Sequence, residues 1–377
     1  MTLDVLHVSS AHSVRDTRIF VKQAASLAER YRVGVLGPGR QTQDWEQDGV
    51  AMQSLLRPTD RLARFTSFKK ALIRRIFEIR PRIVHLHDPD LLLALPRLQR
   101  GGIKVIYDAH EDFSQAPLSR EWLGPPLLRY GVASGFDQIE RRLAQRANGV
   151  VVADRQLLAR FPGASVVRNY LVLEEWPDPA PRPSKTAIRC IYVGDVTRAR
   201  GVFRMCDAME AARSHGVAVE LDLVGPVDQT LVPEIERHPA FASITVHGLL
   251  SRAEVAAQLA RADVALCLPK PFPAYQSALP VKLLEYHAMK LPVVVTDTPR
   301  MRQETGLAPG LIRVPWTAPP ALVAASIRTA SALSTQRRRQ LREHVLTHYA
   351  WGGEKEALFA LYDRVFAQLE PKLAHVA

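Results

Sequence analysis

Short apolar runs alternate with segments of helical periodicity along the first half of the chain, which has 377 residues in all. The apolar runs predict buried strands, and the periodic segments predict amphipathic helices. The strands are expected at Leu3–Ser9, Arg32–Leu36, Ile83–Leu86, Lys104–Asp108 and Gly149–Ala153, and the helices at Arg18–Arg30, Thr66–Arg80, Leu91–Gln99 and Phe136–Ala147. Strands that alternate with helices indicate a parallel sheet covered on both faces.

The alternation stops at Trp176–Ser184, where every second residue is proline, and then begins again. Such a composition is typical of an extended, rather stiff linker. Beyond it we expect strands at Arg189–Val193, Glu220–Val224, Ser243–His247, Val264–Leu268 and Pro292–Thr296, and helices at Val202–His215, Arg252–Arg261, Val281–Lys290 and within Thr335–Leu369.

The length and the two blocks of alternation predict two doubly wound α/β domains, since a chain this long exceeds one ordinary core. We place the first domain at 1–172, the linker at 173–187 and the second domain at 188–351. In open α/β sheets the ligand lies at the carboxyl ends of the strands. The cleft between the two domains is therefore the expected binding site.

The composition is that of an ordinary soluble protein, with 47% hydrophobic and 23% charged residues. Cys190, Cys206 and Cys267 are far apart and flanked by apolar residues, which predicts buried, reduced thiols. The first residues predict a strand and not a signal peptide, and no apolar run approaches the roughly 20 residues that span a bilayer. We therefore expect a cytoplasmic protein, or one that is peripheral on the cytoplasmic face of the inner membrane.

The net charge of +12 suggests an anionic partner. Nucleic acid is disfavoured, because no nucleic-acid motif is present and the basic residues are not interleaved with aromatic ones. The segment Arg57–Arg82 contains nine basic residues and only two acidic ones, and its apolar residues recur at helical spacing. The segment predicts a basic amphipathic helix. In one interpretation its apolar stripe packs on the domain core, and in the other its basic rim contacts an anionic membrane surface. The two interpretations are compatible with each other.

A loop with a glycine at each end, Gly194–Gly201, joins the strand that ends at Val193 to the following helix. Glycines let a backbone approach a ligand closely, and a helix N-terminus can hold a phosphate. Arg198 and Arg200 would add charge-assisted donors. The loop lacks the G-x-G-x-x-G fingerprint and the Gly-Lys-Ser/Thr of a Walker loop. The alternative is an ordinary strand–helix turn with surface arginines.

The segment Gln276–Thr296 predicts a loop, a short helix with Pro280 in its first turn, and a buried strand. Lys282 and Glu285 are three residues apart and share one face of that helix. A cation beside a helix N-terminus suits a diphosphate. A carboxylate one turn further on suits a ribose diol, because it only accepts hydrogen bonds. The alternative is an exposed ion pair on a surface helix.

Histidines and aspartates gather at the ends of two successive strands of the first domain. They are His85, His87, Asp88 and Asp90 in one cluster, and Asp108, His110, Glu111 and Asp112 in the other. Both strand ends are expected to open on the same cleft. These residue types bind metals, but neither cluster has the spacing of a defined metal site. Capping of the next helices explains Asp88 or Asp90 but not the three histidines together.

Together these pieces resemble glycosyltransferase family 4, whose members have the GT-B fold, over nearly the whole chain. The resemblance rests on Ser13–Phe20, His87–Leu92, Tyr107–Asp112, Tyr192–Gly194 with Arg200–Gly201, His247–Gly248, Pro280–Tyr286 and Tyr349–Trp351. It implies two Rossmann-like domains that face each other across a cleft. A last helix, at about 352–377, would cross back onto the first domain, which would bind the acceptor.

The resemblance also implies that a sugar is transferred from a UDP- or GDP-sugar with retention of configuration. The acceptor would be a glycan or lipid-linked, in envelope or exopolysaccharide biosynthesis. Neither a metal nor another cofactor is expected, because basic residues and helix dipoles bear the leaving diphosphate.

The resemblance assigns roles to particular residues. The catalytic residues would be His110, Arg200 and Lys282. The donor would be bound by Gly194, Arg198, Arg200, Gly201, His247, Gly248, Leu249, Ser277, Leu279, Pro280, Lys282 and Glu285. The acceptor or sugar side would comprise Ser10, Arg15, Asp16, His87, Asp88, Asp108 and Glu111.

The chain departs from the family pattern at several positions. Ser277 stands where many members have the first of two glutamates, and Asp195 where many have arginine. Lys290 replaces a glycine that would ease a left-handed helix end, at a cost of about 1 kcal/mol. Two alternatives stay open: a nucleotide-sugar epimerase or hydrolase of the same fold, and a non-catalytic partner in a polysaccharide assembly complex.

Overall fold

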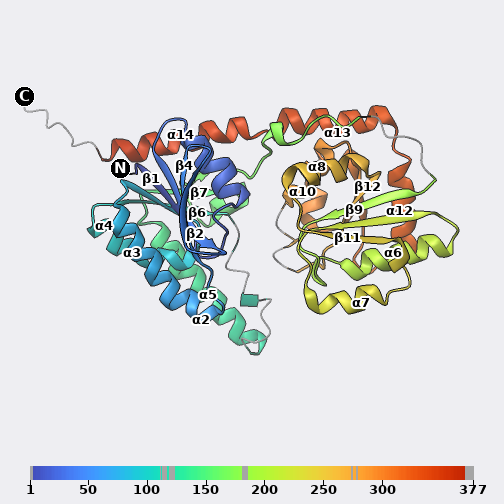
Figure 1. Cartoon of the computed structure of the whole chain (residues 1–377), viewed down its shortest axis with the longest axis horizontal. Coiled ribbons are helices and arrows are strands. Elements are labelled where there is room, and N and C mark those ends of the chain that lie inside the picture. The colour runs from blue at the N-terminus through green and yellow to red at the C-terminus, as the bar shows by residue number, and fades with distance from the viewer. Residues whose placement is uncertain are drawn as a thin grey trace, which may run out of the picture. The chain divides into compact units, whose positions relative to one another are not determined.

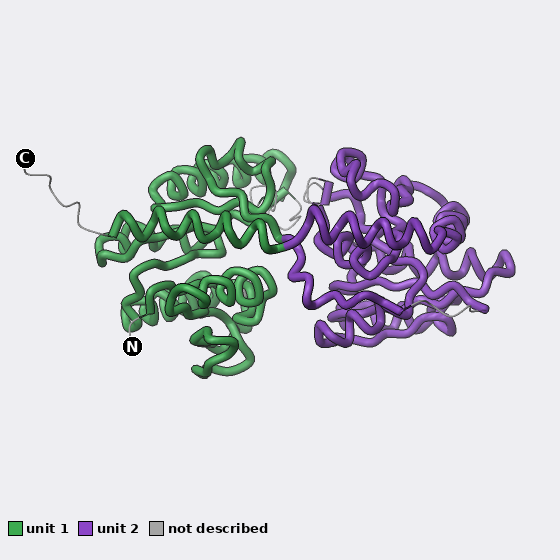
Figure 2. The backbone as a smooth tube through the Cα atoms, turned by 90° about the horizontal axis from the view of Figure 1, so that it is seen from above, with its two compact units in different colours: residues 1–169, 351–377 green, residues 170–350 purple. Residues whose placement is uncertain are grey.

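The computed structural model describes residues 3–110, 112, 117–118, 124–180, 186–272, 275–276 and 279–369. The chain divides into two compact units (Figure 2): unit 1 is Met1–Asn169 with Trp351–Ala377, and unit 2 is Tyr170–Ala350. Each unit is built on a sheet of its own (Figure 1).

Unit 1 contains an eight-stranded sheet with the order β3-β4-β2-β1-β5-β6-β7-β8. Its strands are β1 Val5–Val8, β2 Val33–Gly39, β3 Gln43–Gln47, β4 Val50–Leu56, β5 Ile83–Leu86, β6 Lys104–Ala109, β7 Gly149–Val152 and β8 Ser165–Val166. All neighbours run parallel except β3 and β4. The strand order runs outward in both directions from β1, so it changes direction between β1 and β5. Ligands of open α/β sheets lie at such a switch point.

The two faces of the unit 1 sheet differ in polarity, because alternate residues of a strand point to opposite faces. Leu6 and Val84 join Leu72 and Ile76 in an apolar core on one face. His7 and its register partner His85 lie on the other face. The helical segments of unit 1 are η1 Thr17–Ala24, α1 Ala25–Leu27, α2 Arg61–Ala63, η2 Arg64–Phe68, α3 Lys69–Ile79, η3 Pro89–Ala94, α4 Leu95–Arg100, α5 Pro126–Ala144, η6 Arg155–Ala159 and α14 Trp351–Ala367.

The last helix, α14, packs on unit 1. Trp351 donates from its indole N–H to Ser26 Oγ at 2.8 Å, and Tyr362 OH lies 2.8 Å from His85 Nδ1. Figure 1 shows this helix running along the sheet that carries β1 and β4. It therefore belongs to the polar face of that sheet.

Unit 2 contains a six-stranded sheet with the order β11-β10-β9-β12-β13-β14, in which all neighbours run parallel. Its strands are β9 Ile188–Val193, β10 Val219–Val224, β11 Ile244–Gly248, β12 Val264–Cys267, β13 Val293–Thr296 and β14 Leu311–Val314. The order changes direction between β9 and β12. Alternate residues of β9 enter two different apolar cores, Cys190 in one and Ile191 in the other. This sheet is therefore covered on both faces.

The helical segments of unit 2 are η7 Leu173–Glu175, α6 Val202–Ser214, η8 Gln229–Leu231, α7 Val232–Glu236, η9 Phe241–Ser243, α8 Arg252–Arg261, α10 Val281–Ala288, α11 Pro299–Gln303, η10 Ala308–Gly310, α12 Pro320–Ser331 and α13 Thr335–His348. Pro280 is the residue that precedes α10 and not a member of its first turn, which corrects the expectation from the sequence. Lys290 has a φ of 60°, the left-handed helix end that the family glycine would ease.

Four strands, β3, β4, β8 and β14, were not predicted from the sequence, and the start of one helix was misplaced. β3 is polar and mostly exposed, and it pairs with β4 through a turn at Asp48 and Gly49. β14 is a short edge strand with an exposed arginine. α5 begins at Pro126, ten residues before the predicted start, because exposed apolar residues in its first turns hide the helical period.

The described part of the proline-rich stretch packs on unit 2. Trp176 is buried in one of its cores. Arg342 donates to the carbonyl of Trp176 at 3.0 Å, and Lys290 Nζ lies 2.6 Å from Asp178. Residues 173–180 are therefore held by side-chain contacts within unit 2.

The segment predicted as a basic amphipathic helix is divided between η2 and α3, with α2 before them. Phe68, Leu72 and Ile76 are buried in the core of unit 1. Leu62 and Phe65 are 74% and 43% exposed. Within the described ranges, no helix is both long and apolar enough to cross a bilayer.

Candidate active site

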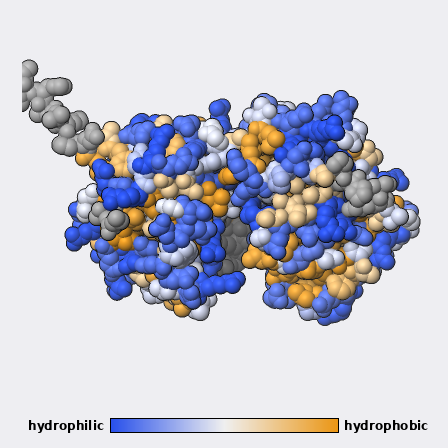
Figure 3. Space-filling model, turned by 45° about the horizontal axis from the view of Figure 1, so that its top comes forward, coloured by the Kyte–Doolittle hydropathy of each residue, from blue (hydrophilic) through white to orange (hydrophobic). Residues whose placement is uncertain are grey.

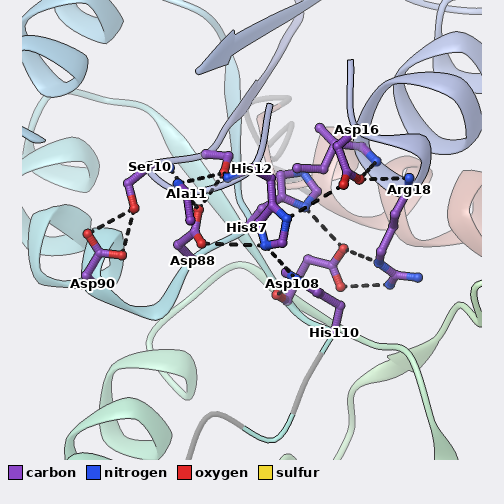
Figure 4. A network of polar contacts seen from close by, with 12 residues as sticks. Ser10, Ala11, His12, Asp16, Arg18, His87, Asp88, Asp90, Asp108 and His110 are labelled. Atoms are coloured by element: carbon purple, nitrogen blue, oxygen red, sulfur yellow. Dashed lines mark hydrogen bonds and ion pairs between the residues drawn. The ribbon is translucent and has the colours of Figure 1, made fainter. Parts of the chain in front are cut away.

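The candidate side chains of unit 1 lie where its sheet order changes direction. Ser9 and Ser10 follow β1, His87 and Asp88 follow β5, and His110 follows β6. These strands are adjacent and parallel, so their carboxyl ends bring the side chains together (Figure 4). This edge is where a doubly wound sheet binds its ligand.

Asp88 fixes the loop that follows β1. Its Oδ2 accepts hydrogen bonds from Ser9 Oγ at 2.6 Å and from the backbone N–H of Ser10 at 2.8 Å. Ser10 Oγ in turn donates to Asp90 at 2.9 Å. Asp88 stands at the N-cap position of η3, as capping of this helix would require, but its side chain makes no capping hydrogen bond there.

Asp108 is fully buried and surrounded by donors. Arg18 in η1 donates to its two oxygens, each at 2.8 Å (Figure 4). Gln23 donates at 2.9 Å, and His87 Nδ1 lies 3.2 Å away. Burial by itself would raise the pKa of Asp108, but Arg18 and the hydrogen bond from His87 hold that pKa well below its usual value. The carboxylate is therefore ionised and fully occupied.

His110 pairs with His12, and their Nε2 atoms are 3.2 Å apart. His12 Nδ1 lies 3.6 Å from Asp16, which also caps η1 by accepting from the backbone N–H of Arg18 at 2.8 Å. Burial alone would raise the pKa of Asp16, but the hydrogen bond with His12 lowers it to about 2. Burial lowers the pKa of His110, so this imidazole is neutral near pH 7.

Two groups of side chains in unit 1 contain metal-binding residue types. His7, His85 and His87 form one, and His87, Asp108 and His110 form the other. The first three rings are stacked or tilted, with centroids 4.6–5.2 Å apart and interplanar angles of 19–37°. Their ligand nitrogens lie within 4.8 Å of one another, and His7 Nδ1 is at hydrogen-bonding distance, 2.9 Å, from His87 Nε2. In the second group Arg18 and Gln23 already occupy the Asp108 oxygens.

Unit 2 also carries charged side chains at its change of strand direction. We call Arg200 and Lys282 the cationic cluster. Lys282 in α10 donates from Nζ to the carbonyl of Val193 at 2.7 Å, and Nζ is 3.3 Å from Tyr192 OH. Burial lowers the pKa of Lys282, and Arg200 lowers it further. Arg200 lies over the ring of Tyr275, 4.5 Å from its centroid. Among the described residues, neither cation forms an ion pair with a carboxylate.

Two glycines of the loop after β9 leave space that a side chain could not share. A Cβ at Gly194, where φ is 134°, would lie 2.5 Å from Lys282 Nζ. A Cβ at Gly201, where φ is 84°, would lie 1.9 Å from the carbonyl oxygen of Leu268. L-residues rarely adopt either conformation. Glycine is therefore needed at 194 for the close approach to the lysine amine and at 201 for the close approach to the Leu268 carbonyl.

The other charged residues of this loop point to the surface. Arg198 forms an exposed ion pair with Glu234. The side chain of Asp195 is exposed, and its backbone carbonyl accepts a hydrogen bond from Tyr192 OH at 3.0 Å. Among the described residues the carboxylate of Asp195 forms no ion pair, with Lys282 or with any other cation.

Glu285 lies one helical turn beyond Lys282 and is 9% exposed. Its Oε1 accepts a hydrogen bond from Arg252 at 3.0 Å. In the edge strand β11, His247 Nε2 lies 2.7 Å from Asp222, and Leu249, just after this strand, is 72% exposed. The ends of these elements thus present a cation, a carboxylate and an exposed apolar side chain.

Family models match most of the chain. The description "Glycosyltransferase Family 4" matches residues 17–162, and "Glycosyl transferases group 1" matches residues 187–331. The chain belongs to glycosyltransferase family 4.

Relatives of this family 4 chain agree with the fold. The glycogen synthase of Mycobacterium tuberculosis is 24% identical over 231 residues, which are 58% of this chain and 52% of that protein. The chain thus spans about half the length of the curated relatives it matches. Sucrose-phosphate synthase from Thermosynechococcus elongatus has a TM-score of 0.73 at 16% identity, covering 97% of this chain and 99% of that one.

Two further solved structures resemble the chain in the same way. Alr3699/HepE from Anabaena, in complex with UDP-glucose, has a TM-score of 0.68 at 13% identity and covers 96% of this chain and 99% of that one. WaaG, a glycosyltransferase involved in lipopolysaccharide biosynthesis, has a TM-score of 0.69 at 15% identity, with 95% and 99% covered. These likenesses establish the GT-B fold of two Rossmann-like domains.

The structure places most of the predicted site residues of this family 4 chain in two groups. Ser10, Asp16, His87, Asp88, Asp108 and His110 share the network of unit 1, and Gly194, Arg200, Gly201, Leu279, Pro280, Lys282 and Glu285 surround the start of α10 or the loop after β9. Arg15 is exposed and lies over Trp45, 5.7 Å from its ring centroid. Glu111 and Ser277 lie outside the described residues.

Sequence reasoning missed several members of these groups, namely His7, His12, Arg18, Gln23 and Arg252. Two of them had a signal. His7 is a polar residue in an otherwise apolar strand, and Arg18 stands in the motif that begins at Ser13. The others are ordinary in their local context, because only tertiary contacts give them partners.

Proposed function

We propose that the chain is a retaining glycosyltransferase that moves a sugar from a UDP- or GDP-sugar to a glycan or lipid-linked acceptor in envelope or exopolysaccharide biosynthesis. The cationic cluster carries this proposal. A buried amine without a carboxylate is costly unless an anion binds beside it. Lys282 is partly buried at the switch point of its sheet, and among the described residues neither it nor Arg200 pairs with a carboxylate, so the diphosphate of a nucleotide-sugar would supply the anion. Solved relatives hold UDP-glucose and UDP-2-fluoro glucose.

The proposed chemistry depends on charge at the leaving group. As the nucleoside diphosphate departs, negative charge grows on its leaving oxygen while the sugar becomes oxocarbenium-like. Arg200 and Lys282 would stabilise that charge through preorganised electrostatics, which is usually the largest catalytic contribution. The two cations would provide what a metal ion provides elsewhere, so we propose a metal-independent reaction.

The network of unit 1 would supply positioning for the sugar. The acceptor hydroxyl would attack from the face that the leaving group vacates, and a phosphate oxygen would take its proton, which retains the configuration. His110 is neutral near pH 7 because burial lowers its pKa. It would therefore hydrogen-bond the transferred sugar, with its Nδ1 beside the backbone carbonyl of Asp108, while Asp88 would fix the backbone at Ser10.

We further propose that unit 1 binds an anionic membrane surface, on the cytoplasmic face of the inner membrane, through Arg57–Arg82. Leu62 and Phe65 are exposed at the start of this segment, and Lys70 and Arg74 are exposed further along it. The face drawn in Figure 3 has small apolar patches among polar residues on both units. Each basic residue near such a surface contributes about 1 kcal/mol. Leu62→Ser with Phe65→Ser should weaken flotation with anionic vesicles, and Leu93→Ser, on η3 with an exposure between those of the other two, should not. Equal flotation with neutral vesicles would refute the electrostatic part.

Donor binding is the first test of the proposed function. UDP-, GDP-, dTDP- and ADP-sugars should be compared by shift of melting temperature and by slow release of free nucleotide. One donor should stabilise the wild type and lose its effect with Glu285→Gln. NMR of the product should then show the anomeric configuration of the donor. An epimerised donor formed without acceptor would favour an epimerase, and no binding of any donor would favour a non-catalytic partner.

A further inference from the structure

Arg252 connects the proposed ribose carboxylate to two other side chains of unit 2. Its NH1 donates to Glu285 Oε1 at 3.0 Å, and its NH2 donates to Glu175 Oε2 at 2.5 Å. The guanidinium also lies over the indole of Trp176, 4.6 Å from the ring centroid. Three contacts, one with α10 and two with the segment at Glu175 and Trp176, thus fix the plane of the guanidinium.

The place of Arg252 in the helix does not explain its presence. It is the first residue of α8, where the N-terminal dipole disfavours a cation. Ser251 and Glu254 already form a capping box there. Burial by itself lowers the pKa of Arg252, and Glu285 and Glu175 more than offset this, so the pKa is raised. The charge of Arg252 is therefore stabilised by the carboxylates of Glu285 and Glu175 and not by the helix.

The contact leaves the Glu285 carboxylate half occupied. Among the described residues, Oε1 accepts the hydrogen bond from Arg252 and Oε2 accepts none. The terminal torsion of a glutamate is otherwise broad, so an unheld carboxylate would lose its orientation. With Oε1 held, Oε2 is presented in one direction.

We propose that Arg252 is a positioning residue, which holds Glu285 so that Oε2 accepts hydrogen bonds from the ribose hydroxyls of the nucleotide. This inference rests on the proposed function, because it assumes that Glu285 meets a ribose. A purely structural role, in which Arg252 clamps residues 173–176 to α8, predicts something different. Such a clamp would weaken every ligand of unit 2 by the same factor.

The test compares nucleoside diphosphates with and without ribose hydroxyls. Dissociation constants are measured by calorimetry for the diphosphate of the preferred base and for its 2′,3′-dideoxy form. The wild type should prefer the ribonucleotide by about tenfold, as expected for a lost hydrogen bond to a charged group. Arg252→Met should reduce this preference to below about threefold, chiefly by weakening the ribonucleotide. Glu285→Gln should do the same.

Two controls keep the test specific. Arg302→Met removes an exposed guanidinium paired with Asp297 in the same unit, and it should keep the full preference. Glu175→Gln leaves Arg252 in place but loosens it, and should lose part of the preference even if Arg252→Met fails to fold. Equal weakening of both nucleotides by Arg252→Met, or an unchanged preference, would overturn the inference. If Glu285→Gln still abolished the preference, the proposed function would stand, whereas a wild type that binds neither nucleotide would reject the function itself.

Discussion

The two polar centres of the molecule satisfy their charges in opposite ways. In unit 1 the buried carboxylate of Asp108 receives Arg18, Gln23 and His87, so its charge is balanced from within. In unit 2 the partly buried amine of Lys282 meets a carbonyl and a phenol but, among the described residues, no carboxylate. A charge that is balanced internally contributes to a fixed shape, whereas a charge that is not balanced is ready for an external ion.

This difference separates a centre whose charges stabilise the fold from one that is open to an anion. Removing a partner from the first centre should unfold the protein more readily without a direct effect on anion binding. Removing the cation from the second centre should have the opposite result. The following changes test whether that division holds.

The largest effect is expected for Arg18→Met. It leaves Asp108 buried without its main counter-charge, which should lower the free energy of unfolding by about 3–5 kcal/mol. Urea unfolding followed by circular dichroism measures this loss. Arg32→Met is the control, because Arg32 pairs with Asp4 at the surface and should cost about 1 kcal/mol or less. Similar losses in the two variants would contradict the comparison.

Lys282→Met should leave stability unchanged or slightly higher, because it removes a buried amine that has no carboxylate partner among the described residues. Sugar transfer should nevertheless fall by about 10²–10³-fold, as for the loss of one preorganised transition-state donor. Initial rates and urea unfolding are measured on the same samples. Lys290→Met, which removes an amine paired with Asp178 just beyond the end of α10, should keep the rate. If Lys282→Met lost stability but transferred sugar at the normal rate, Lys282 would serve the fold and not the reaction.

Acid should destabilise unit 1 before unit 2. Burial lowers the pKa values of His7 and His85 well below 6.5, so the folded state keeps both neutral while the unfolded state takes up protons. Stability from each is therefore complete above about pH 6.5 and falls by about 1.4 kcal/mol per pH unit as the pH drops toward the folded pKa. In unit 2, burial also lowers the pKa of the fully buried His287, to about 4. His7 and His85 together should make the stability of unit 1 fall more steeply with acid than His287 does in unit 2.

Hydrogen exchange at pH 7.5 and 5.0, corrected for intrinsic rates, resolves the two units. Protection should be lost in β1 and β5 before β9 and β12. His7→Gln should make the stability of unit 1 less sensitive to pH, and His215→Gln, an exposed histidine of unit 2, should change nothing. Loss of protection in unit 2 first would show that the histidines do not control the acid response.

The smallest effect is expected for Gly194→Ala. Its Cβ would lie 2.5 Å from Lys282 Nζ and would displace the amine. Donor affinity should fall about tenfold, which corresponds to 1.4 kcal/mol. Gly216→Ala is the control, since Gly216 also has a positive φ, of 73°, but its Cβ would meet no atom within 4 Å. Equal donor affinity in the two variants would mean that the amine does not need its place beside the loop.

Much of the fold followed from local pattern, and the exceptions share a cause. β5, β6, β9 and β13 are apolar runs between helices, so periodicity alone indicated them. β3 was not predicted, because it is a polar edge strand that is defined only by its pairing with β4. Lys282, Glu285 and Gly194 were predicted because their chemistry depends on spacing within one helix or one loop.

The sequence by itself determined the alternation of strands and helices, the family motifs and the residue types at the strand ends, since these depend on neighbours within a few positions. Only the tertiary structure decided which charges meet. Arg18 reaches Asp108 across 90 positions, and Arg252 reaches Glu285 across 33. Such pairs depend on strand order and register, which bring distant segments to one edge of a sheet. For that reason the cations of unit 2 could be named from the sequence, but their lack of carboxylate partners among the described residues could not.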